Sequence, residues 1–302
     1  MELGDFAFTS LPQIATPRAL SGASPLGLLQ DLRGTWDGMG FNVIWRPNNV
    51  PGAPNLDYFL ELNLTHETLR FDEIPGPIPN RGLLQRDIKM FGLSYLQKIE
   101  DRIVIDPTTG KPAGLHIEPG IWATVEATQH PNVGPTVVRM ASIPHGTTVL
   151  AQGTAASIPM RPDIPDISIV PFLIDNPAKP QSFDEIDLSK QSTFRTPDAD
   201  QHFNQAMLHN PNSVLLTALD GKNIKNTVVL NVSSSSGNPV PGGGTANTAF
   251  LEGSPDEGPN AKTARVSATF WIETIEGAAG AADVQQLQYT QTVLLNFNGL
   301  RG

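Results

Sequence analysis

Alternating apolar and polar residues run through much of the chain and predict β-strands. Between Tyr58 and Thr65, leucines at positions 60, 62 and 64 alternate with polar residues, so that an extended segment carries one apolar face. The same period of two recurs in Phe41–Arg46, Thr68–Asp72, Val137–Ile143, Thr227–Val232, Val266–Thr274 and Gln286–Phe297. These segments do not alternate with helices of crossover length, which disfavours a parallel α/β sheet. We therefore predict a mainly β fold: an antiparallel up-and-down barrel of lipocalin type.

Short helices are predicted at the start and in the middle of the chain. Ser24 and Pro25 provide an N-cap and a first helical residue for a helix over Pro25–Leu32, which Gly34 ends. Further on, helices are predicted over Asp200–His209 and from Asn210-Pro211 to Asp220-Gly221.

The remaining segments set the domain organisation. Residues 1–22 form an irregular arm, and residues 156–222 form a proline-rich insertion that includes the two later helices. The insertion is too poor in apolar residues to fold alone, so we expect it to be a flap over one mouth of the barrel. Residues 1–302 are thus predicted to be a single barrel domain.

Composition narrows the class of protein. The chain has 302 residues, of which 39% are hydrophobic, and the 27 glycines and 27 prolines indicate many turns and long loops. The formal net charge of −10 disfavours nucleic acids and anionic membranes as partners. The chain contains no cysteine, no stretch with the features of a signal peptide, and no apolar run long enough to span a membrane. We expect a soluble, cytoplasmic protein, and the oligomeric state stays open.

The entry to the first strand carries a glycine-rich motif around a tryptophan. The motif Gly34-Thr35-Trp36-Asp37-Gly38-Met39-Gly40 lies between the predicted helix and the first strand. In calycin barrels a tryptophan at this place closes one end of the barrel with its indole. We therefore expect Trp36 to close the barrel and to face its ligand, and we do not assign it a catalytic role.

A histidine and a glutamate form the main candidate for chemistry. In the segment Leu115–Trp122, His116 and Glu118 point to one face of a strand, and Leu115 and Ile117 point to the other. A histidine and a carboxylate on one face can transfer a proton or anchor a polar ligand group. The alternative, in which the aliphatic pair faces the interior and the polar pair faces solvent, is equally consistent with the pattern.

Together the two motifs resemble those of a known family. Gly-Thr-Trp-x-Gly-x-Gly at 34–40, followed by His-x-Glu-x-Gly-x-Trp at 116–122, is similar to nitrobindins, haem-binding relatives of the fatty-acid-binding proteins. The resemblance covers about residues 25–155 and extends weakly to 263–298. It implies a ten-stranded barrel that holds haem or another hydrophobic ligand. In nitrobindins the iron-binding histidine lies on a late strand, whereas this chain has no histidine after His209.

Further residues complete the predicted site. His145, in a Pro-His-Gly-Thr turn at the barrel rim, is a candidate general base, or alternatively a turn histidine bonded to the backbone. His145 or His116 is the candidate iron ligand if haem binds. Arg139 could hold a carboxylate or a haem propionate, or it could equally be an outward-facing surface residue. The other candidates for the ligand site are Trp122, Glu273 and Gln288. The remaining histidines are weaker candidates: His66 in a predicted turn, His130 in a loop, and His202 and His209, seven residues apart on one predicted helix.

Three functions follow from these patterns. The preferred one is binding of a flat hydrophobic molecule, with haem first by resemblance, in an apolar cavity with a few polar groups. The alternative is a cofactor-free isomerase, cyclase or hydro-lyase in which His116 and Glu118 transfer protons and Arg139 stabilises negative charge. The third is a transport or storage barrel without chemistry.

Overall fold

A computed structural model shows the fold over most of the chain. It describes residues 8–10, 24–47, 58–143, 145–174, 176–181, 183–190, 195, 202–237, 239–297 and 300–301. Most of the predicted arm at 1–22, and residues 200–201 of a predicted helix, lie outside the described residues.

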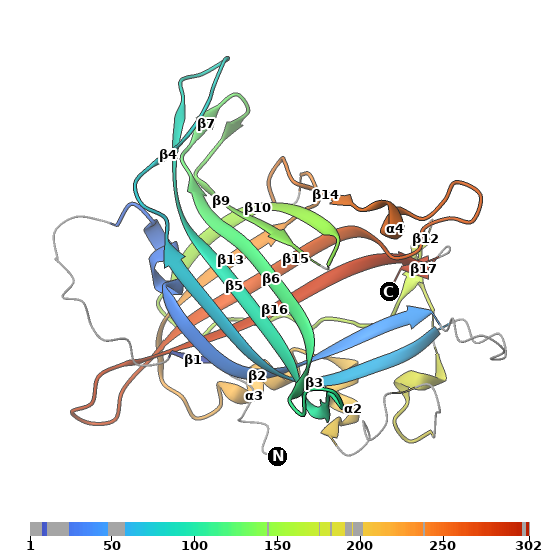
Figure 1. The fold of residues 1–302 in the computed structure, drawn as a ribbon. Helices are drawn as coiled ribbons and strands as arrows, with labels where there is room; N and C mark the ends of the chain where they lie inside the picture. The colour runs from blue at the N-terminus through green and yellow to red at the C-terminus, as the bar shows by residue number, and fades with distance from the viewer. Residues whose placement is uncertain are drawn as a thin grey trace.

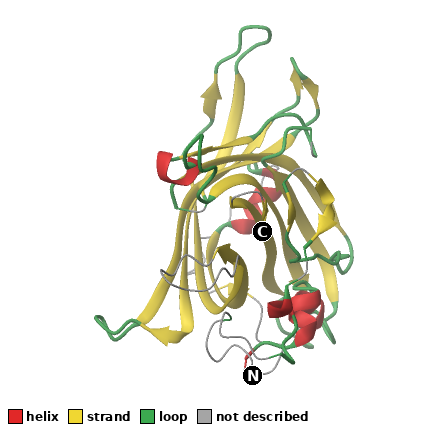
Figure 2. Cartoon of the chain, turned by 90° about the vertical axis from the view of Figure 1, so that its right-hand side faces the viewer, coloured by secondary structure: helices red, strands yellow, loops and turns green. Residues whose placement is uncertain are grey.

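Long antiparallel strands form a nearly closed barrel (Figures 1 and 2). Its strands are β2 (Gly34–Pro47), β3 (Tyr58–Glu73), β5 (Ile88–Ile105), β6 (Pro112–Val125), β9 (Thr136–Ser142), β10 (Thr147–Ile158), β13 (Ile224–Ser233), β15 (Lys262–Ile275) and β16 (Val284–Phe297). Each pairs with the next in this order. The short β1 (Phe8–Ser10) pairs with both β2 and β16 and joins the two ends of the sheet.

Smaller elements are added to this barrel. The short strands are β4 (Ile78–Asn80), β7 (Thr128–Gln129), β8 (Asn132–Val133), β11 (Phe172–Leu173), β12 (Asn176–Pro180), β14 (Gly244–Asn247) and β17 (Leu300–Arg301). The helices are η2 (Gly27–Leu32), η3 (Asp184–Ile186), α2 (Gln205–His209), α3 (Ser213–Ala218) and α4 (Ala249–Glu252). Two hairpins, one near β4 and one near β7, project from the barrel in Figure 1. No helix in the described part of the chain is long and apolar enough to cross a membrane.

One end of the barrel interior is filled by an apolar core. Alternate residues of the strands point inward and pack with the leucines of η2, as period-two strands require. The core includes Leu29, Trp36, Leu93, Trp122 and Phe270. The Trp36 indole nitrogen donates to the Leu32 carbonyl at 2.8 Å, which ties the first strand to the preceding helix.

A second apolar cluster lies on the outside of the barrel. Leu60, Leu62 and Leu64 of β3 are buried, but they pack with Trp45 of β2 and with residues of the insertion. The insertion contributes Phe203, Met207, Leu208 and Val214 to this cluster. Figure 1 shows α2 and α3 below β2 and β3. The leucine face predicted from the sequence is therefore buried against the insertion.

Two local predictions are wrong. The predicted turn at Thr65-His66-Glu67 does not exist, because β3 runs on for 16 residues through it. His66 lies within this strand, with its Nε2 2.9 Å from Asp37 Oδ2. His202 and His209 do not share a helix, since α2 begins at Gln205.

Candidate functional site

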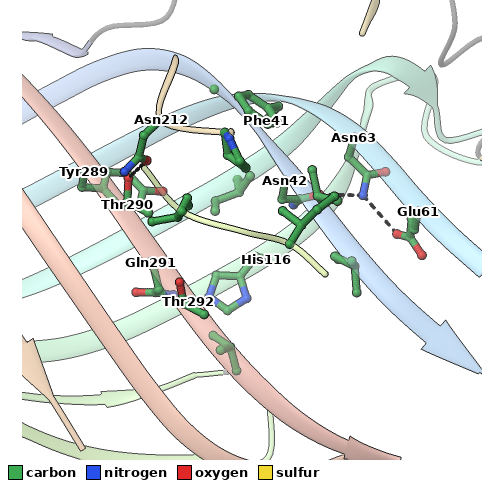
Figure 3. A pocket seen from close by; sticks show the side chains of 18 of the residues that line it. Phe41, Asn42, Glu61, Asn63, His116, Asn212, Tyr289, Thr290, Gln291 and Thr292 are labelled. Carbon is green, nitrogen blue, oxygen red and sulfur yellow. Dashed lines mark hydrogen bonds between the residues drawn. The ribbon is translucent and has the colours of Figure 1, made fainter. Parts of the chain in front are cut away.

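A large cavity lies where the barrel is incompletely closed. Among the described residues, β2 and β16 are connected only through the short β1 and do not pair directly with each other. The cavity, of about 500 Å³, lies between them. Both faces of β2 and β16 contribute to its wall. Insertion residues 167–172, 211–212 and 214–215 contribute to its outer side. Figure 3 shows Asn42 on β2 and Asn63 on β3 on one side of it, and Tyr289 to Thr292 of β16 on the other. The insertion thus forms part of the cavity wall.

Most of the lining is apolar. Aliphatic and aromatic side chains from the barrel and the insertion line the cavity, among them Phe41, Ile44, Ile99, Ile167 and Val293. A mostly apolar wall with polar groups at particular places is the usual composition of a site for small molecules.

A buried carboxyl group forms the centre of the polar wall. Glu67 of β3 is 4% exposed; its Oε1 accepts from the Thr65 hydroxyl at 2.7 Å, and its Oε2 accepts from Gln97 Nε2 at 2.9 Å and from the Tyr289 hydroxyl at 2.5 Å. Burial raises the pKa of Glu67, although these hydrogen bonds and the nearby His116 oppose the rise. Glu67, Gln97 and Tyr289 all line the cavity. This cluster joins β3, β5 and β16.

A second buried carboxylate lies in the barrel interior but does not line the cavity. Glu118 Oε1 accepts from the Tyr95 hydroxyl and from Arg139 Nη2, the latter at 2.5 Å, and Arg139 Nε donates to the Tyr95 hydroxyl at 2.9 Å. Burial raises the pKa of Glu118, but the guanidinium and the hydrogen bonds outweigh it and keep the pKa below its usual value. The guanidinium also lies 5.3–5.7 Å from the ring centres of Tyr95, Trp122 and Phe270. Arg139 therefore neutralises Glu118 inside the barrel.

His116 connects this ion pair to the cavity. It lines the cavity, and its Nε2 is 3.4 Å from Glu118 Oε2. Its ring stacks on that of His145 with 4.8 Å between ring centres and 25° between planes, and His145 Nε2 accepts from the Ile117 backbone N–H at 3.1 Å. Ile117, by contrast, is 51% exposed. Of the two strand orientations that the sequence allows, His116 and Glu118 thus face the interior.

The other predicted ligand residues occupy different places. Trp36 and Trp122 belong to the apolar core and are not in the cavity wall. Gln288 lines the cavity, and its Nε2 donates to the Leu215 carbonyl at 3.0 Å. Glu273, expected beside Gln288, does not line the cavity; it lies on the same face of β15 as Trp271, which packs with the insertion.

Sequence reasoning missed the polar cluster around Glu67. The alternation in β3 places Asn63, Thr65 and Glu67 opposite the leucines, which is typical of a solvent-facing side. Because the insertion covers the leucines, the polar side faces the interior instead. A clue in the sequence is Gly40, because a β-carbon there would lie 3.2 Å from both Glu67 Oε1 and Thr65 Oγ1.

Comparison with known proteins identified no relative. No protein-family model, curated protein or solved structure matches the chain. Within the described residues, no group of three or more histidine, aspartate or glutamate side chains is arranged to hold a metal ion. The site must therefore be interpreted from its own geometry.

Proposed function

We propose that this protein binds a small hydrophobic or amphipathic molecule in the cavity between β2 and β16, within an up-and-down, calycin-like barrel. The observation that carries the proposal is the apolar cavity of about 500 Å³, which is within the size range of small-molecule sites. The insertion shields the outer side of this cavity, and the Glu67 cluster provides the polar groups that orient a ligand.

Ligand binding can be tested by filling the cavity. Ile99 of β5 lines it, whereas the neighbouring Lys98 is exposed on the opposite face of the strand. Ile99→Trp should weaken binding of the uncharged dye Nile red at least about tenfold, because the indole occupies the volume of the ligand. Lys98→Trp is the matched control and should bind the dye like the parent chain. Equal binding by all three chains, or no binding by the parent chain, would contradict the proposal.

Haem binding stays a prediction from the resemblance, and the histidines do not fit an iron site as they are arranged. His145 Nε2 is already an acceptor for Ile117 N–H, and His116 Nε2 faces Glu118. The two rings stack face to face, so they do not direct nitrogens at one iron from its two sides. A titration with haemin checks this. We expect no Soret shift that depends on His116 or His145, and a shift lost in His116→Ala or His145→Ala would restore the haem hypothesis.

Proton transfer is a second candidate function. The observation in its favour is that His116 borders the cavity while the ionised Glu118 lies behind it at 3.4 Å, an arrangement in which the carboxylate orients the imidazole as a base. Arg139 is committed to Glu118 and would not contact a substrate in this arrangement.

Hydrogen–deuterium exchange into a ligand tests this second function. In D₂O, the parent chain should accelerate exchange of the α-hydrogens of a lipophilic ketone. His116→Ala should lower the rate by roughly 10²–10⁴-fold, the usual contribution of a positioned base. If exchange is not accelerated, or if His116→Ala keeps the parent rate, His116 has only a structural or binding role.

A further inference from the structure

Among the described residues, the cavity wall contains carboxyl groups and two histidines, His116 and His145, but no lysine or arginine. The carboxyl groups are those of two glutamates, Glu61 and Glu67. Glu61 lies in an exposed ion pair with Arg46, with 2.6 Å between Nη1 and Oε2. Glu67 is buried and its hydrogen-bond donors are all uncharged side chains. Because His116 already faces Glu118, a ligand carboxylate would find no lysine or arginine partner among the described residues and would lie near a buried acidic group.

The same wall has hydrogen-bond acceptors without donors. Gln288 is 1% exposed, and its Oε1 has no hydrogen-bond partner. The orientation of the Gln288 amide is fixed because its Nε2 donates to the Leu215 carbonyl, so Oε1 is the atom without a hydrogen-bond donor. Gln291, another lining residue, also has an unpartnered buried Oε1. The unpartnered donors of the barrel interior, Trp122 Nε1 and Arg139 Nη1, belong to residues outside the wall.

Buried acceptors without donors are costly unless something supplies a donor. An unsatisfied buried polar group costs about 1–3 kcal/mol, so these oxygens favour any molecule that brings N–H or O–H groups into the cavity. Gln291 lies on the same face of β16 as Tyr289, which donates to Glu67, whereas Gln288 lies on the opposite face, towards the insertion. A positively charged donor also gains from Glu67.

We infer that the ligand is an amphiphile whose polar end is a hydrogen-bond donor, an ammonium group in the first place and a hydroxyl group in the second, and that the cavity disfavours carboxylic acids. The inference rests on the proposed function and specifies its ligand class. Glu67 is the residue that recognises the polar end, and the apolar wall holds the hydrocarbon part.

Three ligands with the same hydrocarbon chain test the inference: dodecylamine, dodecanol and dodecanoate, each below its micellar concentration. Displacement of Nile red from the unaltered chain at neutral pH should give affinities in the order amine, alcohol, acid, with at least a tenfold difference between amine and acid. Equal affinities, or tightest binding of the acid, would overturn the inference and leave the proposed function standing. If none of the three binds and Nile red does not bind either, the proposed function itself fails.

Glu67→Gln assigns the preference to a residue. The amide keeps the shape and cannot carry a negative charge, so the amine should lose its advantage over the alcohol while the alcohol binds nearly as before. Glu100→Gln is the matched control, because Glu100 is exposed on neighbouring β5 and lies outside the cavity wall. This control should keep the preference for the amine. A preference that survives in Glu67→Gln, or that disappears equally in Glu100→Gln, contradicts the role of Glu67. The comparison of amine with acid in the unaltered chain does not depend on the folding of either variant.

Discussion

At the scale of residues, the barrel interior contains two carboxyl groups in opposite electrostatic situations. Glu118 has a guanidinium partner and a lowered pKa, whereas Glu67 has only uncharged donors and a raised pKa. Of these two, only Glu67 lines the cavity. The two carboxyl groups therefore have different roles: Glu118 forms a buried ion pair with Arg139, whereas Glu67 has no cationic partner among the described residues and remains available to a ligand.

The buried ion pair predicts strong coupling between its two residues. Arg139→Met leaves Glu118 without its cationic partner and should lower the free energy of unfolding by about 3–5 kcal/mol. Adding Glu118→Gln removes the unpaired charge, so the double variant should recover a large part of this loss. Urea denaturation of the parent chain, both single variants and the double variant measures the coupling. If the two losses simply add, the pair does not act as a unit.

At the scale of elements, period-two patterns predict strands well but do not say which face of a strand points into the barrel. The leucines of β3 were predicted to be buried, and they are, yet they pack against the insertion. Their polar neighbours were predicted to face solvent or to form a turn, because the pattern does not show that the insertion covers the leucines. In β6, the sequence left both orientations of His116 and Glu118 open, and only the pairing with the neighbouring strands distinguishes them. The motifs thus predicted the strands and the His–Glu pair, while the Glu67 cluster depends on contacts between β3, β5 and β16.

The insertion also buries a carboxyl group on the outside of the barrel. Glu273 of β15 is 0% exposed, and neither of its oxygens has a hydrogen-bond partner of good geometry. Burial raises its pKa to about 8, although Lys222 and the cross-strand Gln286 oppose the rise. This group keeps its proton in the folded state where an unfolded chain would have lost it.

The pKa of Glu273 predicts a pH dependence of stability. Between the ordinary pKa of 4.5 and about 8, the unfolded chain binds fewer protons at this position, so its contribution to stability falls as pH rises through this window. Glu273→Gln is neutral at both pH values, so the difference between its free energy of unfolding and that of the parent chain should depend on pH. This difference should be larger at pH 8 than at pH 4.5 by on the order of 3 kcal/mol. Urea denaturation of both chains at several pH values measures the difference. A difference that stays constant with pH would show that Glu273 titrates normally.

At the scale of the whole molecule, the insertion and the incomplete closure of the barrel belong together. Where β2 and β16 separate, both of their faces become accessible, and residues of the insertion line the outer side of the cavity between them. The insertion accounts for the second apolar cluster as well as for part of the cavity wall. The barrel is therefore covered from outside at the place where its strands leave a cavity.

A crystal structure of the chain grown with dodecanol tests the central claim most directly. The uncharged ligand separates occupancy of the cavity from the charge preference of Glu67. We predict a continuous hydrocarbon chain between β2 and β16, in contact with Ile44, Ile99 and Val293 and covered by residues 167–172. A cavity closed by its own side chains, or a ligand bound only elsewhere on the molecule, would contradict the claim that this barrel is built to hold a small hydrophobic molecule.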